Sequence, residues 1–303
     1  MRKILTTLTR IFLPLLIAFY SPVSLADEVR ITHDGVVLNA NLETVDAGLN
    51  AAPTVLITHG TIAHAGMEII SGLQDLLAER GINSLAINLS LGISDRAQSM
   101  YDCAVRHTHK HVDAMGEIGA WYDWLKAEGA THIAVLGHSR GGNQTARFAA
   151  AQEDGAITAA ILIAPMTWSE EYANKDYKKN YGVELAPLLA KAEALVAAGK
   201  GDEVMKPVDF IYCKQTEATA AAFVGYYRPD ADFDTPHVVS RIKAPVLVVA
   251  GSADTVVHDL IAKMEPLANG DHIKLEVIDG ADHFFRDLYL EDVADLVADQ
   301  IGG

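Results

Sequence analysis

The stretch from Thr131 to Gly142 reads THIAVLGHSRGG, an apolar run that leads into a serine flanked by small residues. β-Branched and apolar residues predict a buried strand over 133–136, and the small apolar residues of 144–151 predict a helix after the turn. Gly137 and Gly141 let the chain turn sharply, which places Ser139 in a strained and exposed position. The alternative is a glycine-rich turn with an incidental serine. The strand–turn–helix context instead predicts Ser139 as a nucleophile at the carboxyl end of a sheet.

A serine hydroxyl at neutral pH needs a base, and the base needs an orienting acid. In a sheet of this kind the partners follow in the order serine, acid, histidine. Asp254 comes just past an apolar run at 246–250, and His283 follows the last run at 273–278. We therefore expect Asp254 and His283 to complete a triad with Ser139. Asp254 as a simple helix cap is one alternative, and three other carboxylates are rival acids: Asp279, Asp282 and Glu170.

Thr58-His59-Gly60-Thr61 ends another predicted strand, whose loop should lie beside the serine turn. Gly60 frees the backbone so that the N–H of Thr61 can face the nucleophile. Together with the N–H of Arg140, it would form an oxyanion hole with two donors. We interpret His59 itself as a structural, hydrogen-bonded residue.

The rest of the chain alternates between short apolar runs and helical patterns. Fully apolar runs of this length are typical of parallel strands covered on both faces. A turn at Asp34-Gly35 joins two N-terminal runs into an antiparallel hairpin. The fold class predicted is a doubly wound α/β sheet, mostly parallel, with antiparallel N-terminal strands. The strands are expected at 29–31, 36–42, 54–58, 84–88, 133–136, 159–164, 246–250 and 273–278, and the helices at 67–80, 112–128, 144–151, 258–267 and 288–301.

Residues 166–240 interrupt this alternation and are too long for a connection within the sheet. The stretch is rich in aromatic residues and has helical patterns at 185–198 and around 216–224. We interpret it as an inserted helical cap on a core formed by 27–165 and 241–303. A pocket walled by these rings would favour apolar or aromatic acyl groups of small to medium size.

Four short motifs, taken in order, resemble the α/β-hydrolase family over nearly the whole chain after residue 26. They are His59-Gly60, Gly137–Gly141, Gly251-Ser-Ala-Asp254 and Gly280-Ala-Asp-His283. The resemblance implies a Ser139–His283–Asp254 triad, a cap at 166–240 and no cofactor. A serine nucleophile differs from the aspartate of dehalogenases and epoxide hydrolases and from the cysteine of dienelactone hydrolases. Thr61 and Ile62 after Gly60 also depart from the extended glycine-rich oxyanion loop of lipases.

The N-terminus has the layout of a secretory signal peptide. Arg2, Lys3 and Arg10 precede an apolar stretch at 11–20, and Ser24 and Ala26 are small residues suited to a cleavage site. The apolar stretch is too short to span about 30 Å of hydrocarbon. We expect cleavage near Ala26, export to the periplasm or outside the cell, and no stable membrane anchor.

The net charge of the chain disfavours some classes of binding partner. The chain has 24 Lys+Arg against 40 Asp+Glu, a formal net charge of −16. No basic run offers a surface for nucleic acid, and a strongly negative field disfavours polyanionic substrates such as acyl-CoA. The partner expected is a small-molecule ester.

The two cysteines, Cys103 and Cys213, have no metal-ligand spacing. In an oxidising compartment they can form one bridge, and two separate buried thiols are the alternative. Sequence alone leaves both open.

His107-Thr-His-Lys-His111 raises the possibility of a metal-dependent hydrolase, because alternate residues of a strand share a face. We expect instead no metal and a loop that faces solvent or the pocket. A peptidase or thioesterase of the same fold and a non-catalytic binding protein are the further functions that this sequence would allow beside an esterase.

Overall fold

The computed structural model describes residues 26–302 of the chain. The predicted signal peptide rests on residues 1–25, which lie outside the described residues. Among the residues described, no helix has the length and apolar character needed to cross a membrane.

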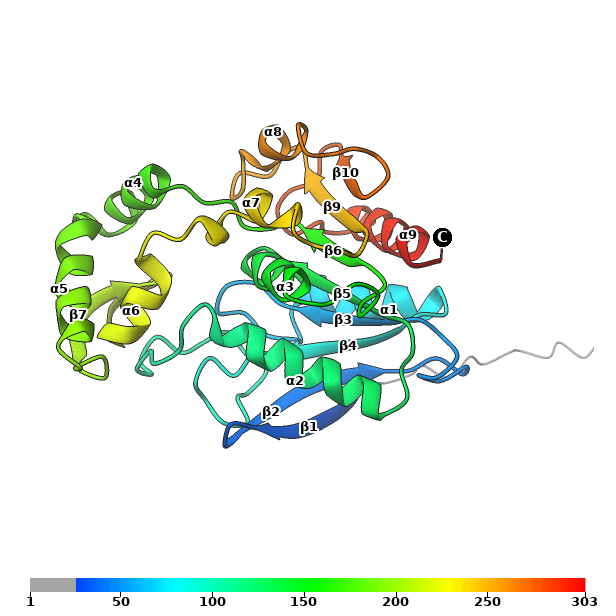
Figure 1. Ribbon diagram of the computed structural model, residues 1–303, viewed down its shortest axis with the longest axis horizontal. Coiled ribbons are helices and arrows are strands. Elements are labelled where there is room, and N and C mark those ends of the chain that lie inside the picture. Colours follow the sequence, from blue (N-terminus) through cyan, green and yellow to red (C-terminus); the bar gives the residue numbers. More distant parts are fainter. Residues whose placement is uncertain (1–25, 303) are drawn as a thin grey trace, which may run out of the picture.

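An eight-stranded sheet forms the centre of the molecule, in the order β1-β2-β4-β3-β5-β6-β9-β10 (Figure 1). β1 pairs antiparallel with β2, and β2 pairs antiparallel with β4, whereas every later pairing is parallel. The predicted fold class is therefore confirmed. The strands are β1 Asp27–His33, β2 Val36–Glu43, β3 Thr54–Thr58, β4 Asn83–Asn88, β5 Ile133–His138, β6 Ala160–Ile163, β9 Val246–Gly251 and β10 Ile273–Ile278.

Helices cover both faces of the sheet. α1 (Glu68–Glu79) packs against α9 (Leu288–Gly302) and β4, while α2 (Asp113–Ala127) packs against α3 (Arg140–Ala150) on the near side in Figure 1. Every residue of β3, β5 and β9 is buried, which is why these strands are almost wholly apolar. Two helix predictions need correction: α3 begins at Arg140, directly after the serine turn, and α8 is only Leu260–Met264.

The segment between β6 and β9 lies beside the sheet, at the left of Figure 1. It is not purely helical, because β7 and β8 form a separate antiparallel hairpin. The helix expected around 216–224 is wrong in its first half: Thr216 to Thr219 belong to β8, and the helix starts at Ala220. The elements are α4 Glu170–Tyr181, α5 Leu185–Ala197, β7 Val204–Phe210, β8 Cys213–Thr219, α6 Ala220–Tyr227, a 3-10 turn Ala231–Phe233 and α7 Thr235–Val239.

A disulfide links Cys103, in the loop after β4, to Cys213 at the start of β8, with Cα atoms 5.3 Å apart. The same loop adds backbone contacts to the hairpin: the N–H of His107 donates to the carbonyl of Glu217 at 2.8 Å, and the N–H of Thr219 donates to the carbonyl of His107 at 2.9 Å. The inserted segment is thus tied to the core by a covalent bond and by strand-like pairing.

Candidate active site

Ser139 lies at the turn between β5 and α3, where the sequence predicted it. Its backbone has φ 57° and ψ −122°, in a region that residues with a side chain rarely adopt. The N–H of Ser139 donates to the carbonyl of Ile163 at 2.9 Å, and its carbonyl accepts from the N–H of Gly142 at 3.0 Å. These bonds hold the strained turn between the sheet and the first turn of α3.

Two glycines make the turn sterically feasible. A Cβ atom on Gly137 would overlap the backbone of Gly141, and a Cβ on Gly141 would overlap the carbonyl of His59. The glycines are therefore required by close backbone approach between β5, α3 and the loop after β3. This packing brings the His59–Thr61 loop against the serine.

His283 and Asp254 converge on Ser139 from the loops after β10 and β9. His283 Nε2 lies 2.9 Å from Ser139 Oγ, and His283 Nδ1 lies 2.8 Å from Asp254 Oδ2. Both partner side chains are buried, with 6% and 4% of their surface exposed. The structure thus brings together the three residues that the sequence selected.

Asp254 is held as a carboxylate by its hydrogen bonds. Burial raises its pKa, but the His283 side chain and the N–H groups of Val256 and Val257 lower it further, so that the pKa falls below the ordinary value. The two N–H groups donate to Asp254 Oδ1 at 2.7 and 3.0 Å. Asp254 therefore caps the following turn and also accepts from His283. An ionised Asp254 selects the tautomer with hydrogen on Nδ1, which leaves Nε2 of His283 free to accept the serine proton.

The rival acids are engaged elsewhere. Asp279 accepts from Ser252 Oγ at 2.9 Å, and Asp282 pairs with Arg286 at 3.2 Å. Glu170 lies exposed in the first turn of α4. His283 has a hydrogen bond to Asp254 alone among these four carboxylates.

Two other histidines lie near the site and form hydrogen bonds with residues other than Ser139. His138 Nε2 hydrogen-bonds the carbonyl of His283 at 2.9 Å, and burial lowers the pKa of His138 to about 4. His59 Nε2 accepts from the N–H of Leu89 at 3.1 Å, and burial, helped by the charge of Arg96, lowers the pKa of His59 to about 3. Both rings stay neutral near pH 7 and act as hydrogen-bonding parts of the scaffold.

Arg96 is a buried residue that sequence reasoning missed. Its guanidinium donates to the carbonyls of Leu89 and Ala63 and to Asn88 Oδ1, at 2.7, 2.8 and 2.6 Å. Burial lowers the pKa of Arg96 to about 10. It ties the loop after β4 to the loop after β3, and no local pattern around position 96 signals this role.

Thr61 and Arg140 both line the cavity beside Ser139. A Cβ built on Gly60 would lie 3.3 Å from the Ser139 Cβ, so the loop approaches the serine closely. Arg140 Nε also donates to Thr61 Oγ1 at 3.1 Å, which joins the two predicted oxyanion residues through their side chains.

The histidine loop differs from expectation, because all three rings are buried. His107 Nδ1 lies 3.2 Å from His109 Nε2, His109 Nδ1 lies 2.8 Å from the Tyr226 hydroxyl, and His111 Nε2 lies 2.9 Å from Asn143 Oδ1. Across residues 26–302, no cluster of three or more His, Cys, Asp or Glu has the arrangement needed to hold a metal ion.

A cavity of about 160 Å³ opens between Ser139 and the inserted segment. Eight of its 19 lining residues are aromatic, and five of these eight lie on α4 and α6. The lining includes Trp168, Tyr172, Tyr177, Tyr181, Tyr226, Tyr227 and Phe233. Burial raises the pKa of Tyr226 and of Tyr227, so both remain neutral phenols.

The sequence matches the profile of the alpha/beta hydrolase family over residues 55–300. A search of the curated proteins found no match. Among solved structures, Est1E from Butyrivibrio proteoclasticus with ferulic acid bound is similar, with a TM-score of 0.64 and 21% identity over 91% of this chain and 100% of that chain. A monoacylglycerol lipase from Paleococcus ferrophilus has a TM-score of 0.60 and 17% identity, over 87% of this chain and 99% of that one. At these identities the likeness establishes the fold.

Proposed function

The chain belongs to the alpha/beta hydrolase family, and we propose that it is a serine hydrolase that cleaves carboxylic esters. The observation that carries the proposal is the continuous hydrogen-bonded line from Ser139 Oγ through His283 to Asp254, at 2.9 and 2.8 Å. This geometry matches the roles of nucleophile, base and orienting acid.

In the proposed reaction, Ser139 Oγ attacks the ester carbonyl while His283 Nε2 takes its proton. The N–H groups of Thr61 and Arg140 stabilise the negative oxygen of the tetrahedral intermediate. His283 then gives the proton to the leaving alcohol, and an acyl group remains on Ser139. Water, deprotonated by His283, attacks this acyl-enzyme and releases the acid. No cofactor takes part.

The aromatic cavity supports small to medium apolar or aromatic acyl groups as substrates. Rings from α4 and α6 offer faces on which an acyl chain or a ring can pack. Ferulic acid, bound to Est1E, is itself an aromatic acid.

Export is part of the same proposal. The signal-peptide layout of residues 1–26 and the Cys103–Cys213 disulfide both suit an oxidising compartment. Detection of the mature protein, beginning at Asp27, outside the cytoplasm would support it.

The test is turnover of p-nitrophenyl esters of increasing acyl length, measured beside aminoacyl anilides and acyl-CoA. We expect the short and aromatic esters to be cleaved fastest. A clear preference for anilides or acyl-CoA would replace the esterase with a peptidase or a thioesterase.

Covalent labelling by a fluorophosphonate identifies the nucleophile. We expect wild type to be labelled and Ser139→Ala to be unlabelled and folded. Ser71→Ala is the matched control, because Ser71 Oγ donates to the carbonyl of Met67 at the start of α1, and Ser71 does not line the cavity. Full labelling of Ser139→Ala would refute the assignment, and an unlabelled, inactive wild type would favour a binding protein.

A further inference from the structure

Arg140 carries a positive charge beside Ser139 that the protein itself does not neutralise. Its side chain lines the cavity, and across residues 26–302 no carboxylate lies within 4.0 Å of its guanidinium. The partners of the guanidinium are uncharged: Nε donates to Thr61 Oγ1 at 3.1 Å and Nη1 donates to His111 Nδ1 at 3.3 Å. The Tyr226 ring lies beneath, 5.3 Å from Cζ.

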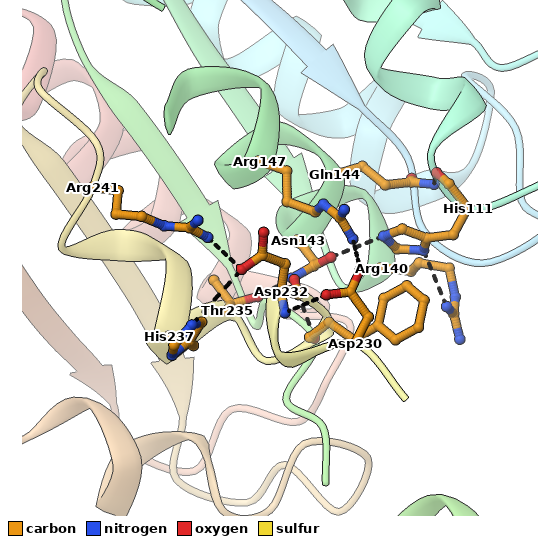
Figure 2. A network of polar contacts seen from close by, with 11 residues as sticks. His111, Arg140, Asn143, Gln144, Arg147, Asp230, Asp232, Thr235, His237 and Arg241 are labelled. Carbon is orange, nitrogen blue, oxygen red and sulfur yellow. Dashed lines mark hydrogen bonds and ion pairs between the residues drawn. The ribbon is translucent and has the colours of Figure 1, made fainter. Parts of the chain in front are cut away.

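This arrangement sets Arg140 apart from the other described arginines. Arg147, on the same helix, also lies over an aromatic ring, at 5.7 Å from Phe233, but it pairs with Asp230 at 3.1 Å (Figure 2). Arg96 lacks a carboxylate as well, yet its guanidinium nitrogens all donate to acceptors of the protein. Each of the remaining described arginines has a carboxylate partner. In a chain with 40 acidic residues, an arginine without a carboxylate partner is unusual.

A chain of hydrogen bonds through His111 and Asn143 also fixes the position of the Arg140 guanidinium. A guanidinium can only donate, so His111 Nδ1 accepts and His111 Nε2 carries the hydrogen that it donates to Asn143 Oδ1 at 2.9 Å (Figure 2). The Asn143 amide then donates to the carbonyls of Asp232 and Phe233, at 2.9 and 3.2 Å. Burial, together with the charges of Arg140 and Arg147, lowers the pKa of His111 and keeps it neutral.

Two of the five N–H groups of Arg140 hydrogen-bond to Thr61 and His111, and the other three have no hydrogen-bond partner among residues 26–302. A planar guanidinium with free donors is suited to a carboxylate, which it binds through two parallel hydrogen bonds. The only acidic side chain among the cavity-lining residues is Asp176 of α4, which accepts from Asn180 and forms no ion pair with Arg140 in the described chain. No acidic side chain of the cavity therefore neutralises the charge of Arg140, and a substrate carboxylate can pair with it.

We propose that Arg140 binds a carboxylate of the substrate, so that the preferred esters carry an ionised carboxylate a few bonds from the scissile carbonyl. This rests on the proposed esterase function and narrows it. Apolar parts of such a substrate would pack on the surrounding rings, while the carboxylate fixes its position next to Ser139.

Two matched pairs of esters test the preference. Monomethyl glutarate against methyl valerate places the carboxylate on the acyl side, and butyryl glycolate against propyl butyrate places it on the alcohol side. We expect kcat/KM in wild type to favour the anionic member of at least one pair. The pair that shows the preference identifies the side on which the carboxylate binds.

Variants at position 140 keep the backbone N–H and change only the side chain. Arg140→Gln should reduce the anionic-to-neutral ratio of kcat/KM by about tenfold or more, the usual effect of a charged hydrogen bond. Arg140→Lys should retain part of the preference, because charge remains without the planar fork. Arg228→Gln removes an arginine that pairs with Glu193 outside the cavity, and it should leave the ratio unchanged.

A binding measurement separates this proposal from the esterase function. Calorimetric titration of Ser139→Ala with glutarate and with dimethyl glutarate requires no turnover. We expect glutarate to bind more tightly, and the Ser139→Ala/Arg140→Gln double variant to lose that advantage. Hydrolysis of all neutral esters with no preference for either anionic member, or a ratio that Arg140→Gln leaves unchanged, would overturn the carboxylate site alone. Absence of both labelling and turnover would overturn the esterase, while the titration would still decide on Arg140.

Discussion

The central sheet and the segment between β6 and β9 differ in burial and in the regularity of their strand pairing. β3, β5 and β9 are buried along their whole length and pair in unbroken parallel register. The β7–β8 hairpin mixes buried and exposed residues without regular alternation, and its register shifts twice. The sheet therefore supplies the rigid edge that carries the three candidate catalytic residues, whereas the insertion supplies a wall whose position depends on contacts with the loop at 103–111.

The largest expected effect on kcat/KM comes from substituting His283 or Asp254, which lie in loops at the edge of the sheet. His283→Ala should lower kcat/KM for a neutral ester by about 10⁴-fold, because the serine then lacks its base. Asp254→Asn should have an effect of similar size, since Asp279 and Asp282 are engaged elsewhere. Steady-state kinetics at constant pH measures both. If Asp254→Asn behaved like wild type, another carboxylate would be the acid.

The insertion should be most sensitive to loss of the disulfide. Replacing both Cys103 and Cys213 by alanine opens a loop of sequence separation 110. The chain-entropy relation gives a loss of about 5 kcal/mol in the free energy of unfolding. Urea denaturation measures the loss, and limited proteolysis should cut first within 166–240. Two free thiols in the denatured, unreduced wild type would show that the bridge does not form.

A pair of glycine substitutions contrasts the two regions directly. Gly141→Ala forces a Cβ into the carbonyl of His59, so we expect a loss of about 3 kcal/mol and of most activity. Gly182 ends α4 with φ 75° and has open space around it, so Gly182→Ala should cost only about 1–2 kcal/mol and keep activity. Equal loss of activity in the two variants would contradict the view that only the core turn positions Ser139.

The smallest effect concerns acid stability at the junction between core and insertion. Burial lowers the pKa of His107 to about 4, below the value of 6.5 in the unfolded chain. Between these values the unfolded state binds more protons, so stability falls as pH falls from about 6.5 toward 4. At pH 5.5 the need to keep His107 neutral in the folded state should lower the free energy of unfolding by about 1.4 kcal/mol.

His107→Phe keeps the ring between Tyr101 and Phe210 and removes the titrating group. Comparing urea midpoints at pH 7.5 and 5.5, we expect a smaller difference in His107→Phe than in wild type. His59 and His138 in the core should preserve the remaining acid sensitivity, because their pKa values are lowered to about 3 and 4. An unchanged pH dependence in His107→Phe would contradict this assignment.

The sheet and its site could be predicted because their signals are local. Parallel strands buried on both faces must be apolar, so 54–58 and 246–250 were recognisable as runs, and β3 and β9 follow them closely. β10 also matches the range 273–278, although this edge strand is only partly buried and carries Lys274 and Glu276. The glycines around Ser139 marked the turn for a comparable reason, since backbone approach there leaves no room for a Cβ. Topology then placed Asp254 and His283 at the same edge of the sheet.

The inserted segment carried no such local signal. Thr216–Thr219, the second half of β8, were predicted as the start of a helix. In the structure β8 pairs with the adjacent β7 in a hairpin of shifted register, and it also pairs with His107, which is distant in the sequence. The histidine loop was predicted to face solvent or the pocket, yet its rings are buried against Tyr101, Phe210 and Tyr226.

By itself, the sequence determined the parallel sheet, the serine turn and the order of the three candidate catalytic residues, since each depends on patterns within a few residues. Only the tertiary structure decided whether the two cysteines pair, where the histidine rings lie, and that Arg140 meets His111 and Thr61 but no carboxylate. Those outcomes depend on contacts between segments far apart in the chain, which no local pattern encodes.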